Sequence, residues 1–228
     1  MDDLFADSAL RGQQLDRRAI ERLAGAPQKL VDCDLEAVDL SRLDLSDWTF
    51  ERCSFRKTDL AGATLERTDW QSCRSAFANF TGADFTDATL IACDFNNASL
   101  KRACLEGARI ERCKLTGADL TDARALHVHF DETLLINAKM NARFFRKAKL
   151  RRIDFSHANL SRCDFREASF EACSLRETIL DDARFEGADL RGADIGGVRR
   201  QDASRFRGAI ISRDQAAQFL SELGLMIM

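Results

Sequence analysis

Cysteine is the residue type with the widest chemical repertoire in this chain, because thiols bind zinc, form disulfides and act as nucleophiles. Six of the 8 cysteines fall in one register with a spacing of 20 residues: Cys33, Cys53, Cys73, Cys93, Cys113 and Cys173. No pair has the C-x-x-C spacing of a zinc or redox motif, and a straight column cannot surround an ion tetrahedrally. We therefore interpret the column as small core residues that are reduced and free of metal. Cys104 lies outside the column at a position expected to face solvent, which predicts the one reactive thiol.

Histidine gives no stronger indication of a catalytic or metal site. His127 and His129 form a pair, and His157 lies apart from them. The pair has no nearby acidic or cysteine ligands at a known metal spacing. The chain also contains no Ser/His/Asp grouping, phosphate-binding loop or glycine-rich dinucleotide loop. We therefore expect no enzyme activity, no metal and no cofactor.

The strongest pattern in the sequence is a large apolar residue at every fifth position from Leu30 to Ile195. Of 34 such positions, 31 carry Leu, Phe, Ile or Met and one carries Trp70, while Ser75 and Ala125 are the exceptions. A period of five matches neither a helix nor a flat strand. It predicts a chain that turns a corner every five residues, which is a solenoid, and solenoids bind partners more often than they catalyse reactions.

The spacing of identical residues predicts the cross-section of this solenoid. The residue two before each centre is small, so it is expected to point inward beside the centre. Glycine two after several centres, as at Gly62 and Gly107, suits a corner that needs a positive φ. Twenty residues, the spacing of the cysteine column and of Phe145, Phe165 and Phe185, contain four fives. The section is therefore predicted to be square, and coils stacked about 4.8 Å apart give a shaft of roughly 40 Å.

These units, of which Ala83-Asp84-Phe85 and Ala118-Asp119-Leu120 are the clearest, resemble the consensus A-(D/N)-L-x-x of pentapeptide-repeat proteins. The resemblance implies an all-β solenoid, namely a right-handed quadrilateral β-helix with four pentapeptides per coil. It covers about Leu30 to Ile195, and we assign residues 30–211 to the repeat domain. The resemblance is specific for the fold and weakly specific for function.

The two ends of the chain are predicted to cover the solenoid, because an open coil exposes core and unpaired strands. Residues 1–29 are assigned to an N-terminal cap, in which a short amphipathic helix over 15–23 is favoured over an early coil. At the other end, Ser212 and Gln215 have the spacing of a capping box. Residues 212–228 are therefore expected to form a short C-terminal helix and an apolar tail. The residues of this segment predicted to be buried in a homodimer are Phe219, Leu220, Leu223 and Met226.

The total charge is −3, but it is unevenly distributed along the repeat. Residues 30–100 hold 13 acids and 6 bases, whereas residues 101–160 hold 7 acids and 13 bases. The basic side chains of the second stretch gather at Lys139, Arg143, Arg146, Lys147, Lys149, Arg151 and Arg152. A solvated surface is the simpler interpretation of both stretches, since three of every five positions face water.

The sequence supports two classes of function. The uninterrupted shaft, the length and the ending Leu223-Gly224-Leu225 are similar to those of the Qnr and MfpA-like group, and the absence of inserted loops is closer to the MfpA type. This resemblance implies a dimeric mimic of duplex DNA that binds DNA gyrase or topoisomerase IV and counters quinolones. The acidic residues predicted to contact such a partner are Asp34, Asp39, Asp44, Asp59, Asp69, Asp84 and Asp94. The alternative is a protein-interaction scaffold for another partner.

Other partners are not indicated by the sequence. We expect no direct contact with nucleic acid, because the basic stretch has few interleaved aromatic residues. No apolar run is long enough to cross a membrane. The acidic N-terminus lacks the form of a signal peptide, so we expect a cytoplasmic protein.

Overall fold

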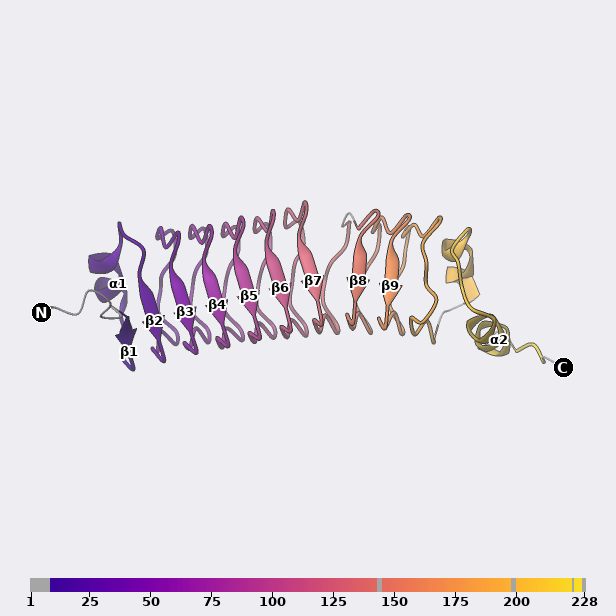
Figure 1. The fold of residues 1–228 in the computed structure, drawn as a ribbon, viewed down its shortest axis with the longest axis horizontal. Helices are drawn as coiled ribbons and strands as arrows, with labels where there is room; N and C mark the ends of the chain where they lie inside the picture. Colours follow the sequence, from indigo (N-terminus) through magenta and orange to yellow (C-terminus); the bar gives the residue numbers. More distant parts are fainter. Residues whose placement is uncertain (1–8, 143–144, 198–199, 223, 227–228) are drawn as a thin grey trace, which may run out of the picture.

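The backbone forms a single parallel solenoid in which nine short strands stack along one side of a shaft (Figure 1). The computed structural model describes residues 9–142, 145–197, 200–222 and 224–226. The strands are β1 (Leu10–Arg11), β2 (Lys29–Val31), β3 (Thr49–Glu51), β4 (Asp69–Gln71), β5 (Thr89–Ile91), β6 (Arg109–Glu111), β7 (His129–Asp131), β8 (Lys149–Arg151) and β9 (Ser169–Glu171). Neighbours in sequence are neighbours in space, and each strand pairs with the next at an offset of 20 residues, as Leu30 does with Phe50.

The remaining three sides of the shaft are held by single bridges with the same offset. Asp34 bridges to Ser54, Asp39 to Asp59 and Asp44 to Thr64. Each coil therefore contains four pentapeptides, and the predicted fold class is confirmed. The offset of 20 also places the centres of successive coils directly above one another.

The interior is a continuous apolar shaft built from these centres. Phe145, Phe165 and Phe185 stack with ring centroids 5.1 and 5.0 Å apart. These separations are close to the spacing of adjacent strands, as expected for side chains one coil apart. The predicted column of Leu35, Phe55, Phe95, Leu115, Leu135, Phe155 and Leu175 is buried, with no member more than 1% exposed.

Ser75 interrupts that column without interrupting the backbone. Its N–H still donates to the Asp94 carbonyl of the next coil at 2.6 Å. The neighbouring centre is Trp70, whose ring centroid lies 4.6 Å from that of Phe55, so a large indole accompanies the small Ser75. The Ser75 hydroxyl is buried and has no hydrogen-bond partner. The expected irregularity is thus one of side-chain packing.

The corners of the square share one backbone conformation whatever residue occupies them. The residue two after each centre has a positive φ, from 48° at Arg152 to 84° at Gly192. This conformation costs roughly 1–2 kcal/mol for a residue other than glycine. The corner N–H groups donate to the next coil, as Ala37 does to the Arg56 carbonyl at 2.9 Å, and such bonds hold the strained corners. Glycine marked only a few of these corners in the sequence.

The N-terminal end combines an early coil with a helix. Strand β1 pairs with β2 and Gln14 bridges to Asp34, so residues 10–14 already follow the solenoid. Helix α1 (Arg17–Leu23) then begins, and the Asp16 side chain accepts a hydrogen bond from the Ala19 N–H at its N-terminus. Ile20 of this helix is 1% exposed, because it covers the apolar core of the first coil.

The C-terminal end is closed by a 3-10 helix, η1 (Arg200–Phe206), and by helix α2 (Arg213–Glu222). Phe206 continues the aromatic stack with its ring centroid 4.9 Å from that of Phe185. The predicted capping box is present, since the Ser212 N–H donates to Gln215 Oε1 and the Gln215 N–H donates to Ser212 Oγ. Gln215 Nε2 also donates to the carbonyls of Leu190 and Ala193 at 2.7 Å, which ties α2 to the last coil. None of the helices described is long and apolar enough to cross a membrane.

Candidate protein-binding surface

The predicted acidic residues precede corners, and the corners use their carboxylates. In six of the seven, Oδ1 accepts a hydrogen bond from the backbone N–H two residues further on, at 2.8 to 3.0 Å; these are Asp34, Asp39, Asp44, Asp59, Asp84 and Asp94. The seventh, Asp69, is an exposed residue of β4. Because each of the six carboxylates has a second oxygen and more than one lone pair, the turn does not use up its capacity to bind a partner.

Hydroxyl groups beside two of these aspartates favour their charged form. The hydroxyl and the backbone N–H of Ser46 lower the pKa of Asp44 below its ordinary value. Ser41 lowers the pKa of Asp39 in the same way, with a smaller contribution from the Arg17 guanidinium. Both carboxylates are therefore fully ionised at neutral pH.

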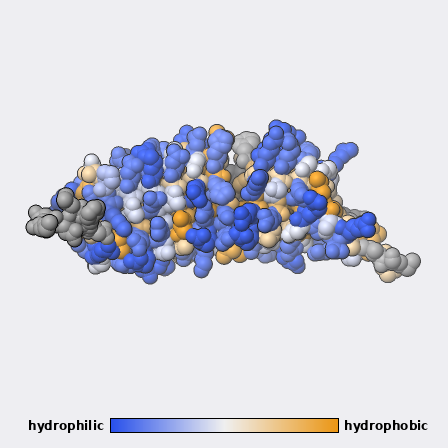
Figure 2. All heavy atoms as spheres, in the orientation of Figure 1, coloured by the Kyte–Doolittle hydropathy of each residue, from blue (hydrophilic) through white to orange (hydrophobic). Residues whose placement is uncertain are grey.

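The seven aspartates do not form one face. The offset of 20 places Asp39 and Asp59 in one row, Asp44 and Asp84 in a second, Asp34 and Asp94 in a third, and Asp69 in a fourth. The structure thus distributes them over all four sides of the shaft. Figure 2 shows the result on one flank, where hydrophilic residues cover most of the surface.

Ion pairs between coils neutralise part of the acidic stretch. Arg52 contacts Asp32 through two hydrogen bonds of 2.7 and 2.9 Å, and Arg67 contacts Asp47 through two of 2.8 Å. Arg17 of α1 pairs with Asp39 at 3.2 Å. Among the described residues, no ion pair is formed by the other six predicted aspartates or by Asp87.

One corner nevertheless keeps a concentration of negative charge, which we call the acidic corner: residues 44–49, 64–69 and 84–89 of three successive coils. It holds six acidic side chains and one base, a net charge of −5. Its acidic members without an ion pair in the described part of the chain are Asp44, Asp69, Asp84 and Asp87. Asp87 was missed by the sequence analysis, and its signal is the 40-residue offset from Asp47. Asp87 Oδ1 lies over Gly107 of the next coil, where a Cβ would come within 2.2 Å of it.

The basic stretch is largely paired within the shaft. Arg146 and Lys147 both contact Glu167, at 2.8 and 3.5 Å. Lys139 contacts Asp119 at 3.3 Å, and Arg152 contacts Glu132. Arg143 lies outside the described residues. Lys149 forms no ion pair among the described residues, although it is exposed.

The C-terminal end exposes apolar side chains beyond the last coil. Leu220 of α2 is 39% exposed, Leu225 is 55% exposed and Met226 is 95% exposed. Ile210 and Ile211 add exposed apolar surface just before α2. Phe219 is half-buried, and Leu223 lies outside the described residues. We call Ile210, Ile211, Leu220, Leu225 and Met226 the C-terminal apolar patch.

The cysteines lie in the core. A hydrogen bond with the Cys53 thiol, together with burial, raises the pKa of Cys73 to about 12. Burial raises the pKa of Cys173 to about 11. Cys104 is only 5% exposed, and its sulfur lies 3.3 Å from the Thr86 hydroxyl. The prediction of a solvent-facing, reactive Cys104 was therefore wrong, because its side chain packs against the preceding coil. No three His, Cys, Asp or Glu side chains of the described residues are placed to hold a metal ion.

Comparison with known proteins identifies the repeat. The description of pentapeptide repeats in eight copies matches residues 29–69, 78–117 and 113–151, and that in nine copies matches residues 145–198. No curated protein matches the chain.

Solved structures show the same fold. A trypsin-treated form of QnrB1, a plasmid-mediated fluoroquinolone resistance protein, is 18% identical with a TM-score of 0.57, covering 96% of this chain and 97% of that one. Full-length QnrB1 gives 18% identity and a TM-score of 0.50, with 95% and 97% covered. HetL, involved in heterocyst differentiation in the cyanobacterium Nostoc, gives 24% identity and a TM-score of 0.47, with 80% and 86% covered.

Proposed function

Because this chain belongs to the pentapeptide-repeat family, we propose that it is a non-enzymatic binding protein that mimics duplex DNA and occupies the DNA site of gyrase or topoisomerase IV. The observation that carries the proposal is the acidic corner, where four carboxylates without ion pairs among the described residues lie along one edge of a rigid rod. By displacing DNA, such a protein protects the enzyme from inhibitors that trap it on DNA, which fits the description of QnrB1 as a fluoroquinolone resistance protein.

The density of charge on the acidic corner supports the proposal. Three coils extend roughly 14 Å along the shaft, a length over which duplex DNA carries about eight phosphate charges. The net charge of −5 on this one corner is more than half of that. The remaining charges of the acidic stretch are either paired with arginine or lie on other sides, so the mimicry is confined to this edge.

We also propose that two chains assemble through the C-terminal apolar patch. A twofold contact is self-complementary, so one patch on each chain is sufficient. The patch lies beyond the last coil, at the opposite end of the shaft from α1 (Figure 1). The resulting rod of roughly 80 Å carries an acidic corner on each side of its centre, which suits an enzyme with twofold symmetry.

The experiment that tests the DNA-mimic function is a gyrase supercoiling and DNA-cleavage assay with and without a quinolone. The variant carries Asp44→Asn, Asp84→Asn and Asp87→Asn on the acidic corner. Its matched control carries Asp34→Asn, Asp59→Asn and Asp94→Asn on other sides. Asparagine keeps an oxygen that accepts the turn hydrogen bond, so these substitutions chiefly remove charge.

We expect the wild type and the control to inhibit supercoiling and to reduce quinolone-dependent cleavage, and the acidic-corner variant to lose both effects. A wild type without effect on gyrase and on topoisomerase IV would support the alternative, a scaffold for another protein. Equal loss in the two variants would show that the acidic corner is not the contact surface.

The dimer is tested separately by light scattering. Leu220→Asp with Met226→Asp places two charges in the C-terminal apolar patch and is expected to give a monomer. Phe77→Asp is the control, because Phe77 is 55% exposed on the shaft, away from that patch. A wild type that is monomeric at micromolar concentration contradicts the dimer.

A further inference from the structure

The backbone ladder opens at one place along the shaft. Strands β7 and β8 pair only through Asp131 and Arg151, whereas β6 and β7 pair through three residues each. Figure 1 shows β7 and β8 more widely separated than the strands before them. The ladder is closed at the Asp131 end, where the Glu132 N–H donates to the Arg151 carbonyl at 3.0 Å. The opening is therefore a wedge.

Specific backbone bonds that the other coils make are absent from this wedge. One coil earlier, the Gly107 N–H donates to the Leu126 carbonyl and the His129 N–H to the Ala108 carbonyl. The corresponding bonds from His127 to Arg146 and from Lys149 to Val128 are missing among the described residues. On the adjoining side, the bond expected from the Asp122 N–H to the Asn141 carbonyl, both within the described range 9–142, is missing as well.

The cause lies in the centre of the coil above the wedge. Ala125 occupies the position where its column has Leu45, Leu65, Phe85 and Leu105 before it and Phe145, Phe165 and Phe185 after it. A single methyl group cannot fill the shaft there, so the coil lacks the packing that draws the next coil close. Ala125, Val128 and Ala148 are accordingly half-buried, although most residues in equivalent positions are buried.

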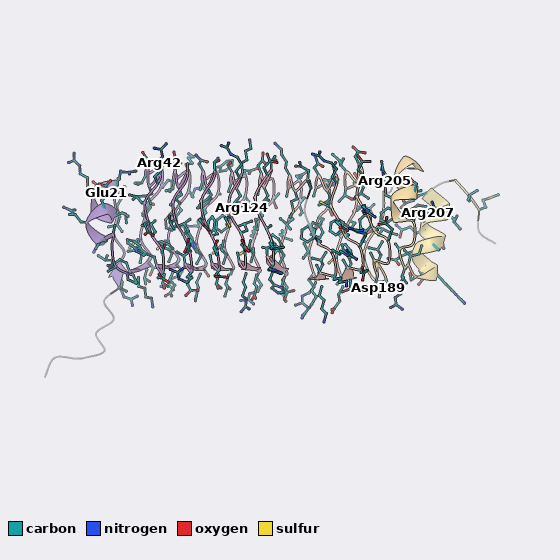
Figure 3. The ribbon with its side chains drawn as sticks, turned by 90° about the horizontal axis from the view of Figure 1, so that it is seen from above. Glu21, Arg42, Arg124, Asp189, Arg205 and Arg207 are labelled. Atoms are coloured by element: carbon teal, nitrogen blue, oxygen red, sulfur yellow. The ribbon has the colours of Figure 1, made fainter. Side chains whose placement is uncertain are left out.

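A cleft of about 450 Å³ occupies the wedge between residues 125–130 and 145–150. A second lobe of about 510 Å³ adjoins it at Ala125 and Leu126 and extends to Asn141 and Ala142. Phe130, Phe145 and Leu150 form the apolar inner part of the first lobe. Arg124, which lines the second lobe, is labelled in Figure 3 about halfway along the shaft.

The two lips of the cleft have the chemistry of open strand edges with positive charge. In the described part of the chain, the N–H groups of His127 and Lys149 are donors without a ladder bond, and the carbonyls of Arg146 and Val128 are the acceptors they would have used. The side chains around them are His127, His129, Arg146, Lys147 and Lys149, of which Lys149 forms no ion pair with any described residue. Leu126 is 56% exposed at the junction of the two lobes.

We propose that this cleft is a docking site for an extended acidic peptide segment of a partner protein, with an apolar side chain inserted between the coils. A peptide backbone supplies both donors and acceptors, as strand addition to an open edge requires. An inorganic anion supplies acceptors only. Acidic side chains complement the basic lips, and one apolar side chain fills the space that Ala125 leaves. The inference is independent of the proposed topoisomerase function, since the acidic corner lies on other coils.

The proposal is tested by fluorescence anisotropy with a labelled octapeptide that alternates Glu with Val or Phe. The matched peptide has Lys in place of every Glu. We expect the acidic peptide to bind the full-length protein roughly tenfold more tightly than the basic one, and Lys149→Glu to weaken it roughly tenfold. Lys114→Glu, at an exposed position where the ladder is intact, is the control and is expected to change the affinity less than about twofold.

A second variant separates binding from folding. Ala125→Leu restores the side chain typical of its column and is expected to close the wedge, preserve or raise thermal stability, and abolish peptide binding. Hydrogen exchange gives the matching readout in the wild type, where the amides of His127 and Lys149 are expected to exchange faster than that of Gly107 and to slow when the peptide is added.

Three results would overturn the proposal. They are equal binding of the acidic and basic peptides, binding by Ala125→Leu as strong as that of the wild type, and complete displacement of the peptide by millimolar inorganic phosphate. The last result would identify a small-anion site. Failure of the wild type to bind the acidic peptide would also refute it, and would leave the gyrase assay unaffected.

Discussion

Gln215 holds helix α2 on the last coil, and its removal provides a sharp test of how the C-terminal end is closed. Its side chain makes three hydrogen bonds of 2.7 Å, accepting from the Ser212 N–H and donating to the carbonyls of Leu190 and Ala193. The residue is 8% exposed, so in Gln215→Ala water replaces these partners poorly. At about 1 kcal/mol for each bond, the expected loss is about 3 kcal/mol.

The loss is measured by thermal denaturation followed by circular dichroism. For a chain of this size, 1 kcal/mol corresponds to about 2–4 °C, so the expected fall in melting temperature is about 6–12 °C. Because solenoid stability is local, hydrogen exchange is expected to accelerate in the last coil and in α2 more than near β3.

The matched control is Gln218→Ala on the same helix. The Gln218 side chain donates to Glu222 at 3.1 Å, an exposed contact within the helix, so this change is expected to stay within about 0.5 kcal/mol. Equal melting temperatures for the two variants would refute the reasoning, since they would show that the bonds to the last coil contribute nothing.

Three further substitutions or treatments test the interior and the ion pairs. Ser75→Ala removes a buried hydroxyl without a partner and is expected to stabilise the protein by about 1 kcal/mol in chemical denaturation; a loss of stability would contradict this. Arg67 lowers the folded-state pKa of Asp47, so the pair stabilises the fold above the unfolded pKa of about 3.9, and this contribution is lost as the pH falls through the lower folded value. Wild type and Asp47→Asn should therefore differ in denaturation midpoint at neutral pH and converge in acid. Cys73, with its pKa raised to about 12, and the other buried thiols should resist iodoacetamide until the protein is unfolded, as mass spectrometry would show; labelling of the native protein would contradict their burial.

The repeat made most of the fold predictable. A side chain's position in the five-residue unit decides whether it faces the shaft, and Leu35, Phe55 and Phe95 are buried as that position predicts. The capping box at Ser212 and Gln215 was also readable, because it depends on residues three apart. The wrong prediction for Cys104 has a physical reason. Its place in the unit is normally outward, but a small thiol there lies against Thr86 of the preceding coil.

The candidate site was less predictable, because charge on a solenoid depends on neighbours 20 residues away. Asp47 and Asp87 are equivalent in the sequence unit, yet Arg67 pairs with Asp47 and leaves Asp87 without an ion pair among the described residues. The seven predicted aspartates were chosen by their place before a corner, which recurs on every side of the shaft. That choice could not show which of them share an edge.

The amino-acid sequence alone determined the square shaft, the inward columns and the number of coils, because each of these results from a period repeated without a shift. The tertiary structure decided which carboxylates stay unpaired and how Ala125 affects the coils around it. A small side chain at one centre is only a local exception in the sequence. In the stacked shaft, where each coil is held by the one beside it, it removes the packing between two coils and opens their ladder.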